Sequence, residues 1–242
     1  ERKSRVISDA EKLIIAFHEG GHAVVQRILP KCDPVNKVTI ISRGMALGYT
    51  MALPTEDRYL QSKTEFEDKI AGLLGGNVSE RLIFGDTTTG SSNDIEKATD
   101  LARRMVTEFG MSDRLGPLSF GKRDELVFLG REIGEQRNYS DEIAKMIDEE
   151  VRAIIDRAYE RATQVLETHR DRLEKLAQKL IAEETVDGEA FESLFSDLPP
   201  KEDLHGLPPR HHEPPAAEEP AGHGTKPEPQ PKPRSSPAPH PA

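Results

Sequence analysis

Apolar residues recur at the spacing of an α-helix along most of the first 198 residues of the chain. A capping box, Ser8 with Glu11 three residues later, precedes the first of these patterns, and Pro30 follows its end. We therefore predict a helix from about residue 9 to Leu29. The same spacing predicts further helices over about residues 62–85 and 93–109, a long helical region from Ser140 that breaks near His169, and a short helix at 189–195.

Two short segments have the composition of strands instead. Residues 38–41 are all β-branched, and residues 46–52 follow the turn signal Arg43-Gly44. Together they predict a small hairpin or meander, while the Gly-rich residues 111–138 should be mostly irregular. The predicted fold class is mainly α with a small β element.

Composition divides the chain at about residue 198. The last 44 residues hold 14 of the 18 prolines and contain no Val, Ile, Phe, Tyr or Met. Such a segment has too little apolar surface to offset the entropy of ordering it. We therefore predict one folded domain over residues 1–198, which includes a C-terminal helical region at about 140–198, and a disordered Pro-rich tail over 199–242.

Charge and cysteine content exclude several classes of protein. A net charge of −10 is opposite in sign to a nucleic-acid-binding surface. The single cysteine, Cys32, excludes an internal disulfide framework and a Cys-rich zinc site. The longest apolar run, residues 13–17, is too short to cross a bilayer. Because the chain begins at Glu1, we expect it to be part of a longer protein, with any membrane attachment in upstream segments.

The motif that carries chemistry is His18-Glu19-Gly20-Gly21-His22, in the first predicted helix. Residues i and i+4 of a helix lie about 40° apart on one face and about 6 Å apart along the axis, so the two imidazoles can bind one Zn²⁺. Glu19, between them, can hold and deprotonate a water molecule at the metal. The motif also uses two of the three histidines in residues 1–198.

The third zinc ligand is not evident from the residues themselves. His169 lies in a charged helical stretch, which is typical of a solvated histidine. Three carboxylates remain as alternatives: Glu80, Asp86 and Asp94. A carboxylate such as Asp94 in the first turn of a helix also has a purely structural explanation, because it interacts favourably with the helix dipole.

One other motif, Gly116 to Lys122, has the spacing of a phosphate-binding loop. The next residue is Arg123 rather than Ser or Thr, so the hydroxyl that binds Mg²⁺ is missing, and Pro117 lacks an N–H that a phosphate would need. We therefore predict no nucleotide-binding residues in this chain.

The order of the motifs resembles the protease domain of FtsH-type, membrane-anchored ATP-dependent zinc metalloproteases. The resemblance covers about residues 1–195. The segments that carry it are His18 to Ala23, Asp33 to Ile41, Gly75-Gly76, Ser92-Asn93-Asp94, Gly116-Pro117-Leu118 and Phe128 to Glu132. Gly20 stands where the family usually has Ala, and Arg81 replaces the second of a pair of family carboxylates.

The resemblance implies a zincin-like fold, a site and an assembly. It implies that Asp94 is the third ligand of one Zn²⁺ per chain, with His18 and His22, that Glu80 lies just outside the ligands, and that Glu19 is the catalytic base. It also implies a homo-hexamer at the cytoplasmic face of the cell membrane. There an ATPase module that is absent from this chain, and not the chain itself, would use ATP to feed unfolded or membrane-protein polypeptides to the site.

The strand pattern at Ala46, Leu47, Gly48 and Tyr49 marks a candidate edge on which an unfolded polypeptide could pair. The prediction is thus a zinc metalloendopeptidase domain that hydrolyses peptide bonds of unfolded polypeptides. The alternative is a non-catalytic helical oligomerisation module in which the zinc motif is vestigial.

Overall fold

The computed structural model describes residues 7–42, 48–53, 59–121 and 139–201, and these residues are mainly helical. The helices are α1 (Asp9–Ile28), α2 (Lys63–Phe84), α3 (Ser92–Thr107), α4 (Asp141–Thr168), α5 (Arg170–Glu183) and α6 (Gly188–Glu192). The strands are β1 (Val35–Thr39), β2 (Tyr49–Ala52) and β3 (Thr185–Asp187). Short 3-10 helices at Thr89–Ser91 and Ser193–Phe195 precede α3 and follow α6. The predicted fold class is confirmed.

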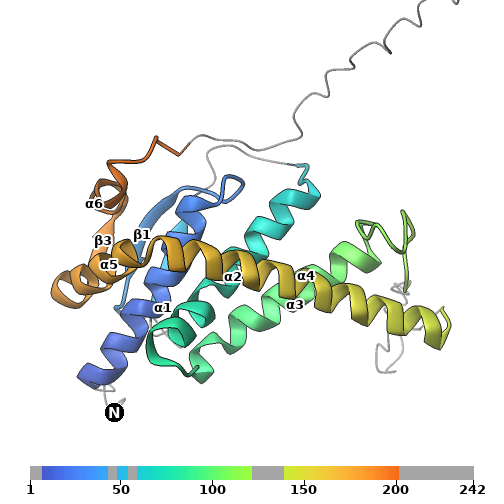
Figure 1. Ribbon diagram of the computed structural model, residues 1–242, viewed down its shortest axis with the longest axis horizontal. Helices are drawn as coiled ribbons and strands as arrows, with labels where there is room; N and C mark the ends of the chain where they lie inside the picture. Colours follow the sequence, from blue (N-terminus) through green and yellow to red (C-terminus); the bar gives the residue numbers. More distant parts are fainter. Residues whose placement is uncertain (1–6, 43–47, 54–58, 122–138, 202–242) are drawn as a thin grey trace, which may run out of the picture. The chain divides into compact units, whose positions relative to one another are not determined.

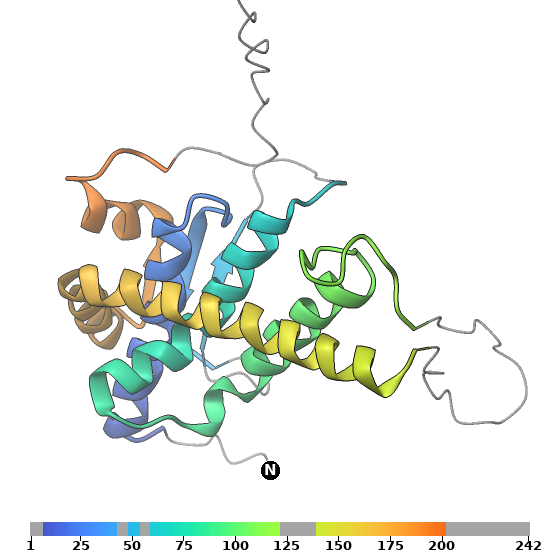
Figure 2. The same ribbon diagram turned by 45° about the vertical axis from the view of Figure 1, so that its right-hand side comes forward.

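Helix α1 is the centre of the folded part. It packs against α2 and α5 and also contacts the small sheet, while α4 crosses α2 and α3 in both views (Figure 1 and Figure 2). From Ile15 to Val25 every residue of α1 except Phe17 is buried, including the charged Glu19. The part of α1 that carries the zinc motif therefore has almost no solvent-facing side.

Local sequence signals set the ends of α1 and α2. Ser8 forms a capping box at α1, and Ser62 forms another at α2. Gly85, in the left-handed conformation with φ of 71°, ends α2. The long C-terminal helical region breaks at His169, between α4 and α5, as the sequence predicts.

The sheet differs from the prediction in its bounds and in its number of strands. The strand predicted at 38–41 instead covers Val35–Thr39. Its pairing with β2 extends back through the polar Lys37 to Val35, past the start of the β-branched run, with an irregularity in register between those two residues. The hairpin with β2 is confirmed, although residues 46 and 47 lie outside the described residues. The third strand, β3, was not predicted, since three residues are too few to display an alternating pattern. It pairs with β1 and gives the antiparallel order β2-β1-β3.

Helices α1 and α2 approach each other backbone to backbone. A Cβ added to Gly21 would lie against the carbonyl oxygen of Gly75 and 2.5 Å from the Cβ of Ser79. A Cβ added to Gly75 would lie 2.8 Å from the carbonyl oxygen of Gly21 and 3.1 Å from the Cα of His22. Only glycine leaves room for this contact, so Gly21 of the motif and Gly75 of α2 are required by packing.

The end of the folded part is held by two arginines around one aromatic ring. The guanidinium groups of Arg27 and Arg172 lie over the buried ring of Phe195, at 5.2 and 5.1 Å from its centroid. Arg27 also donates a 3.0 Å hydrogen bond to the carbonyl oxygen of Pro199, and Lys201 bonds the carbonyl oxygen of Gln26 on α1. Contacts therefore extend a few residues past 198. The rest of the predicted tail, and most of the segment 111–138, lie outside the described residues.

In the part of the chain that the structure describes, no helix combines the length and the apolar character needed to span a bilayer.

The glycine contact can be tested with two neighbouring substitutions. Gly21→Ala forces the α1 and α2 backbones apart, and we expect it to destabilise the domain by about 3 kcal/mol and to lower Tm by about 6–12 °C. Gly20→Ala is the matched control. Its Cβ would meet only the end of the Leu173 side chain at 3.1 Å, and the gain in helix propensity offsets that contact, so Tm should change by less than about 4 °C. Differential scanning calorimetry measures both, and equal losses would contradict the packing argument.

Candidate metal centre

Two imidazole nitrogens converge beside the first helix. His18 and His22 are both buried, and their Nε2 atoms lie 3.1 Å apart. The two rings are nearly perpendicular, with an interplanar angle of 80°. This is the arrangement that the i, i+4 spacing predicts for two ligands of one metal ion.

Helix α3 adds a carboxylate to the pair. The Oδ2 atom of Asp94, in its first turn, lies 3.5 Å from the Nε2 of His18 and 3.4 Å from the Nε2 of His22. A tetrahedral zinc site with bonds of 2.0–2.1 Å has ligand-to-ligand distances of about 3.3–3.4 Å. The three observed separations of 3.1, 3.4 and 3.5 Å match that geometry, so these residues fit a zinc ion.

Hydrogen bonds on the far side of each ring select the tautomer that a metal needs. The Nδ1 of His22 donates to the carbonyl oxygen of Gly72 at 2.8 Å, because a carbonyl oxygen can only accept. The Nδ1 of His18 lies 2.6 Å from the Oε1 of Glu80, which accepts in the same way when it is ionised. In the neutral rings both Nε2 lone pairs then point at each other and at Asp94. A metal cation placed between them would satisfy all three groups together.

The surrounding charges favour a cation in the same place. Burial by itself lowers the pKa of His18, but Asp94, Glu80 and Glu19 outweigh it and raise that pKa to about 9. Burial opposes ionisation of Asp94, yet the hydrogen bonds from the two histidines hold the pKa of this carboxyl well below its usual range. For Glu80, burial raises the pKa, but the hydrogen bonds with His18 and with the amide of Thr88 together outweigh burial and lower it. The protein therefore stabilises positive charge at this point.

A glycine leaves the space for the two rings. A Cβ added to Gly76 of α2 would lie 2.5 Å from the Cε1 of His18 and 2.6 Å from the Nε2 of His22. Any other residue would occupy the space that the imidazoles need. The glycine-rich stretch of α2 thus shapes the site as well as the helix crossing.

The glutamate of the motif lies beside the two histidines and is buried. Burial raises the pKa of Glu19, although His22 and His18 oppose this effect. Its Oε2 accepts a 2.9 Å hydrogen bond from the hydroxyl of Thr50 on β2. A buried carboxyl group thus lies next to the group His18, His22 and Asp94, and a carboxylate in such a place has the chemistry of a general base.

A comparison of the sequence with known families decides the identity. The sequence profile of peptidase family M41 matches residues 5–194, which is more than half of the chain. The chain belongs to peptidase family M41. Curated relatives bear names that agree with this result.

Two of these relatives show the extent of the similarity. ATP-dependent zinc metalloprotease FtsH 1 of Sphaerobacter thermophilus is 58% identical over 208 residues, which cover 86% of this chain and 32% of the relative. ATP-dependent zinc metalloprotease FtsH of Bacillus subtilis is 55% identical over 195 residues, which cover 80% of this chain and 31% of the relative. The M41 chain therefore spans about a third of the length of the curated relatives it matches.

The M41 structure separates the candidate ligands that the sequence left open. Asp94 lies with the two histidines, whereas Asp86 is exposed after α2, where it accepts a bond from the amide of Thr87. The Oε1 of Glu80 contacts the Nδ1 of His18, and its Oε2 accepts a 2.5 Å bond from the amide of Thr88. The ring of His169 contacts Arg172, and His169 is not part of the group formed by His18, His22 and Asp94.

Other site residues were not identified from sequence. The carbonyl of Gly72 accepts from His22, and the hydroxyl of Thr50 donates to Glu19. Gly76 has no side chain and so leaves space for the two imidazole rings. The Gly75-Gly76 pair was a visible signal, but sequence alone does not say what a glycine leaves room for. Of the predicted substrate edge, Gly48 and Tyr49 are described, while Ala46 and Leu47 lie outside the described residues.

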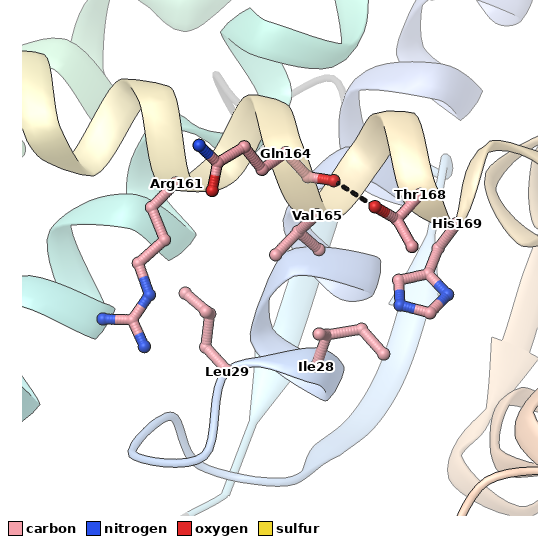
Figure 3. A pocket seen from close by; sticks show the side chains of 7 residues that line it. All are labelled: Ile28, Leu29, Arg161, Gln164, Val165, Thr168 and His169. Carbon is pink, nitrogen blue, oxygen red and sulfur yellow. Dashed lines mark hydrogen bonds between the residues drawn. The ribbon is translucent and has the colours of Figure 1, made fainter.

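A surface pocket between the ends of α1 and α4 contains none of these groups (Figure 3). It is lined by Ile28, Leu29, Arg161, Gln164, Val165, Thr168 and His169. Its Thr168 hydroxyl bonds the carbonyl of Gln164 in its own helix, and its Arg161 is paired with Asp68. This pocket therefore does not include the group His18, His22 and Asp94.

The third ligand can be tested against a nearby carboxylate. We expect Asp94→Ala to lower zinc affinity by more than about 100-fold, because it removes a group at ligand distance, whereas loss of an outer partner costs 10–100-fold. Asp86→Ala, eight residues earlier and exposed, is the matched control and should bind zinc like the unchanged chain. Titration against a chelating dye measures both affinities. Equal zinc affinity of the two variants would show that Asp94 is not a ligand.

Proposed function

We propose that this chain is a zinc metalloendopeptidase domain in which His18, His22 and Asp94 hold one Zn²⁺ and Glu19 is the general base. The observation that carries the proposal is the convergence of two Nε2 atoms and one carboxylate oxygen at 3.1–3.5 Å, beside a buried glutamate. Membership of family M41 supports the assignment to peptide hydrolysis.

In this proposal the metal would supply Lewis-acid chemistry, which lowers the pKa of water toward neutrality and polarises the scissile carbonyl. The residues of the chain supply the proton transfers. Glu19 takes a proton from the attacking water and gives it to the nitrogen of the leaving amine. Glu80 and the carbonyl of Gly72 keep the two imidazoles in the orientation and tautomer that ligation requires.

The substrate is an extended polypeptide that pairs with the edge of the sheet. Among the described strands β2 has a neighbour on one side only, β1, so its other edge can accept main-chain hydrogen bonds. This edge begins beside Glu19, since a Cβ on Gly48 would lie 3.0 Å from the Oε1 of that residue. Pairing through the main chain is largely independent of sequence and suits unfolded substrates. Ala46, Leu47, Gly48 and Tyr49 are the proposed substrate-strand residues.

The natural context of the domain is larger than the chain. The relatives are about three times as long and are named ATP-dependent. We infer that the domain works in a homo-hexamer with an ATPase module, at the cytoplasmic face of a cell membrane, on unfolded and membrane-protein polypeptides. In that arrangement ATP drives unfolding and delivery, and the hydrolysis itself needs only the residues of this chain.

The role of Glu19 can be isolated from metal binding. Glu19→Gln keeps the size of the side chain and removes the base, so zinc content should stay near one ion per chain while hydrolysis of a fluorogenic peptide falls by at least about 100-fold. Metal analysis and initial rates are measured on the same preparation. Turnover near that of the unchanged chain would refute Glu19 as the base. A nearly metal-free unchanged chain would instead favour the vestigial, non-catalytic alternative.

The division of labour between this chain and an ATPase can be tested with one substrate protein in two states. We expect the isolated chain to cleave the permanently unfolded form without ATP, because a buried site can admit an extended chain. The stably folded form should persist with or without ATP. Gel-based degradation assays follow both forms. ATP-stimulated degradation of the folded form would contradict the proposed division.

A further inference from the structure

The hydroxyl of Thr50 contacts both the side chain and the backbone of Glu19. Thr50 is the second residue of β2 and lies opposite Val38 of β1. Its Oγ1 donates to the Oε2 of Glu19 at 2.9 Å and lies 3.1 Å from the backbone carbonyl oxygen of Glu19. A hydroxyl has one proton, so the two acceptors share it or take it in turn. In either case the oxygen bridges the helix backbone and the carboxylate of the same glutamate.

A glutamate side chain has three rotatable bonds before its carboxylate, and burial alone does not select one orientation. The bridge from Thr50 restricts those torsions, because the carboxylate can move only as far as a hydrogen bond of normal length allows. The backbone of residue 48 also passes close to this side chain, since a Cβ added to Gly48 would lie 3.0 Å from both the Cγ and the Oε1 of Glu19. The side chain of Glu19 is thus held close to residues 48 and 50 of one strand segment.

We propose that Thr50 is a positioning residue for the reaction, which orients the carboxylate of Glu19 through its hydroxyl. The inference rests on the proposed function, in which Glu19 is the base. Because Thr50 belongs to the edge strand proposed to bind the polypeptide, one residue then sets the distance between the base and the bound main chain. A displacement of about 1 Å at a reacting group can lower a rate by about 100-fold.

The test compares side chains of equal shape with and without the hydroxyl. Thr50→Val should lower kcat for an unfolded peptide by about 10- to 100-fold and leave KM within about threefold, because the substrate edge is main chain. Zinc content should be unchanged. Thr50→Ser retains the hydroxyl and should keep kcat within about threefold of the unchanged chain.

A control removes a threonine hydroxyl from the neighbouring strand. Thr39 of β1 donates to the carbonyl oxygen of Glu184 and contacts the hydroxyl of Thr185. Thr185 belongs to β3, which pairs with the edge of β1 that does not face β2. Thr39→Val should lower Tm more than Thr50→Val does, and its kcat, measured where the variant is folded, should stay within about threefold. A structural role of Thr50 would give the same pattern as Thr39, a change in Tm without a change in kcat.

The outcomes separate the inference from the function on which it rests. Unchanged kcat in Thr50→Val, with Glu19→Gln inactive, overturns the positioning role and leaves the proposed function intact. No zinc-dependent hydrolysis by the unchanged chain overturns both. If Thr50→Val fails to fold, Thr50→Ala and Thr50→Ser form a second pair that differs by one oxygen. Equal kcat within that pair also overturns the inference.

Discussion

The backbone contact between Gly21 and Gly75 sets the distance on which the whole site depends. Because α1 and α2 touch without side chains between them, one face of α2 comes within reach of the two imidazoles. Gly72, Gly76 and Glu80 follow one another at intervals of four residues, so they lie on that face. The first accepts from His22, the second leaves space for both rings, and the third contacts His18. A larger separation of the helices would remove all three contacts together.

The same close packing explains why a strongly charged site can exist inside the domain. Glu19, Glu80 and the two histidines are buried among apolar side chains of α1 and α2, and isolated charges there would be costly. Each group has at least one partner whose chemistry complements it, either a ring nitrogen, a carbonyl oxygen, an amide or a hydroxyl. The site as a whole carries more acidic than basic groups, and a divalent cation would compensate this excess of negative charge.

Local signals account for the parts of this structure that the sequence predicts. The caps at Ser8 and Ser62 and the break at His169 each depend on residues within a few positions, so they can be recognised without a fold. Strand β3 could not be recognised, because its three residues become a strand only by pairing with β1. For a related reason the residues alone could not distinguish among Glu80, Asp86 and Asp94 as the third ligand. Their distances from His22 are set by helix packing, and only the family resemblance favoured Asp94.

Glu80 makes the proposed ligands interdependent. One of its oxygens contacts the ring of His18, and the other accepts from the amide of Thr88, in the loop that leads into α3 and Asp94. The carboxylate therefore connects the two parts of the proposed chelator, the histidines of α1 and the aspartate of α3, which are more than 70 positions apart along the chain. Chelators of this kind bind tightly because their donors are already in place before the ion arrives. In this domain that preorganisation is a property of tertiary structure, so an ion held at the site would also tie the α3 loop to the central helix.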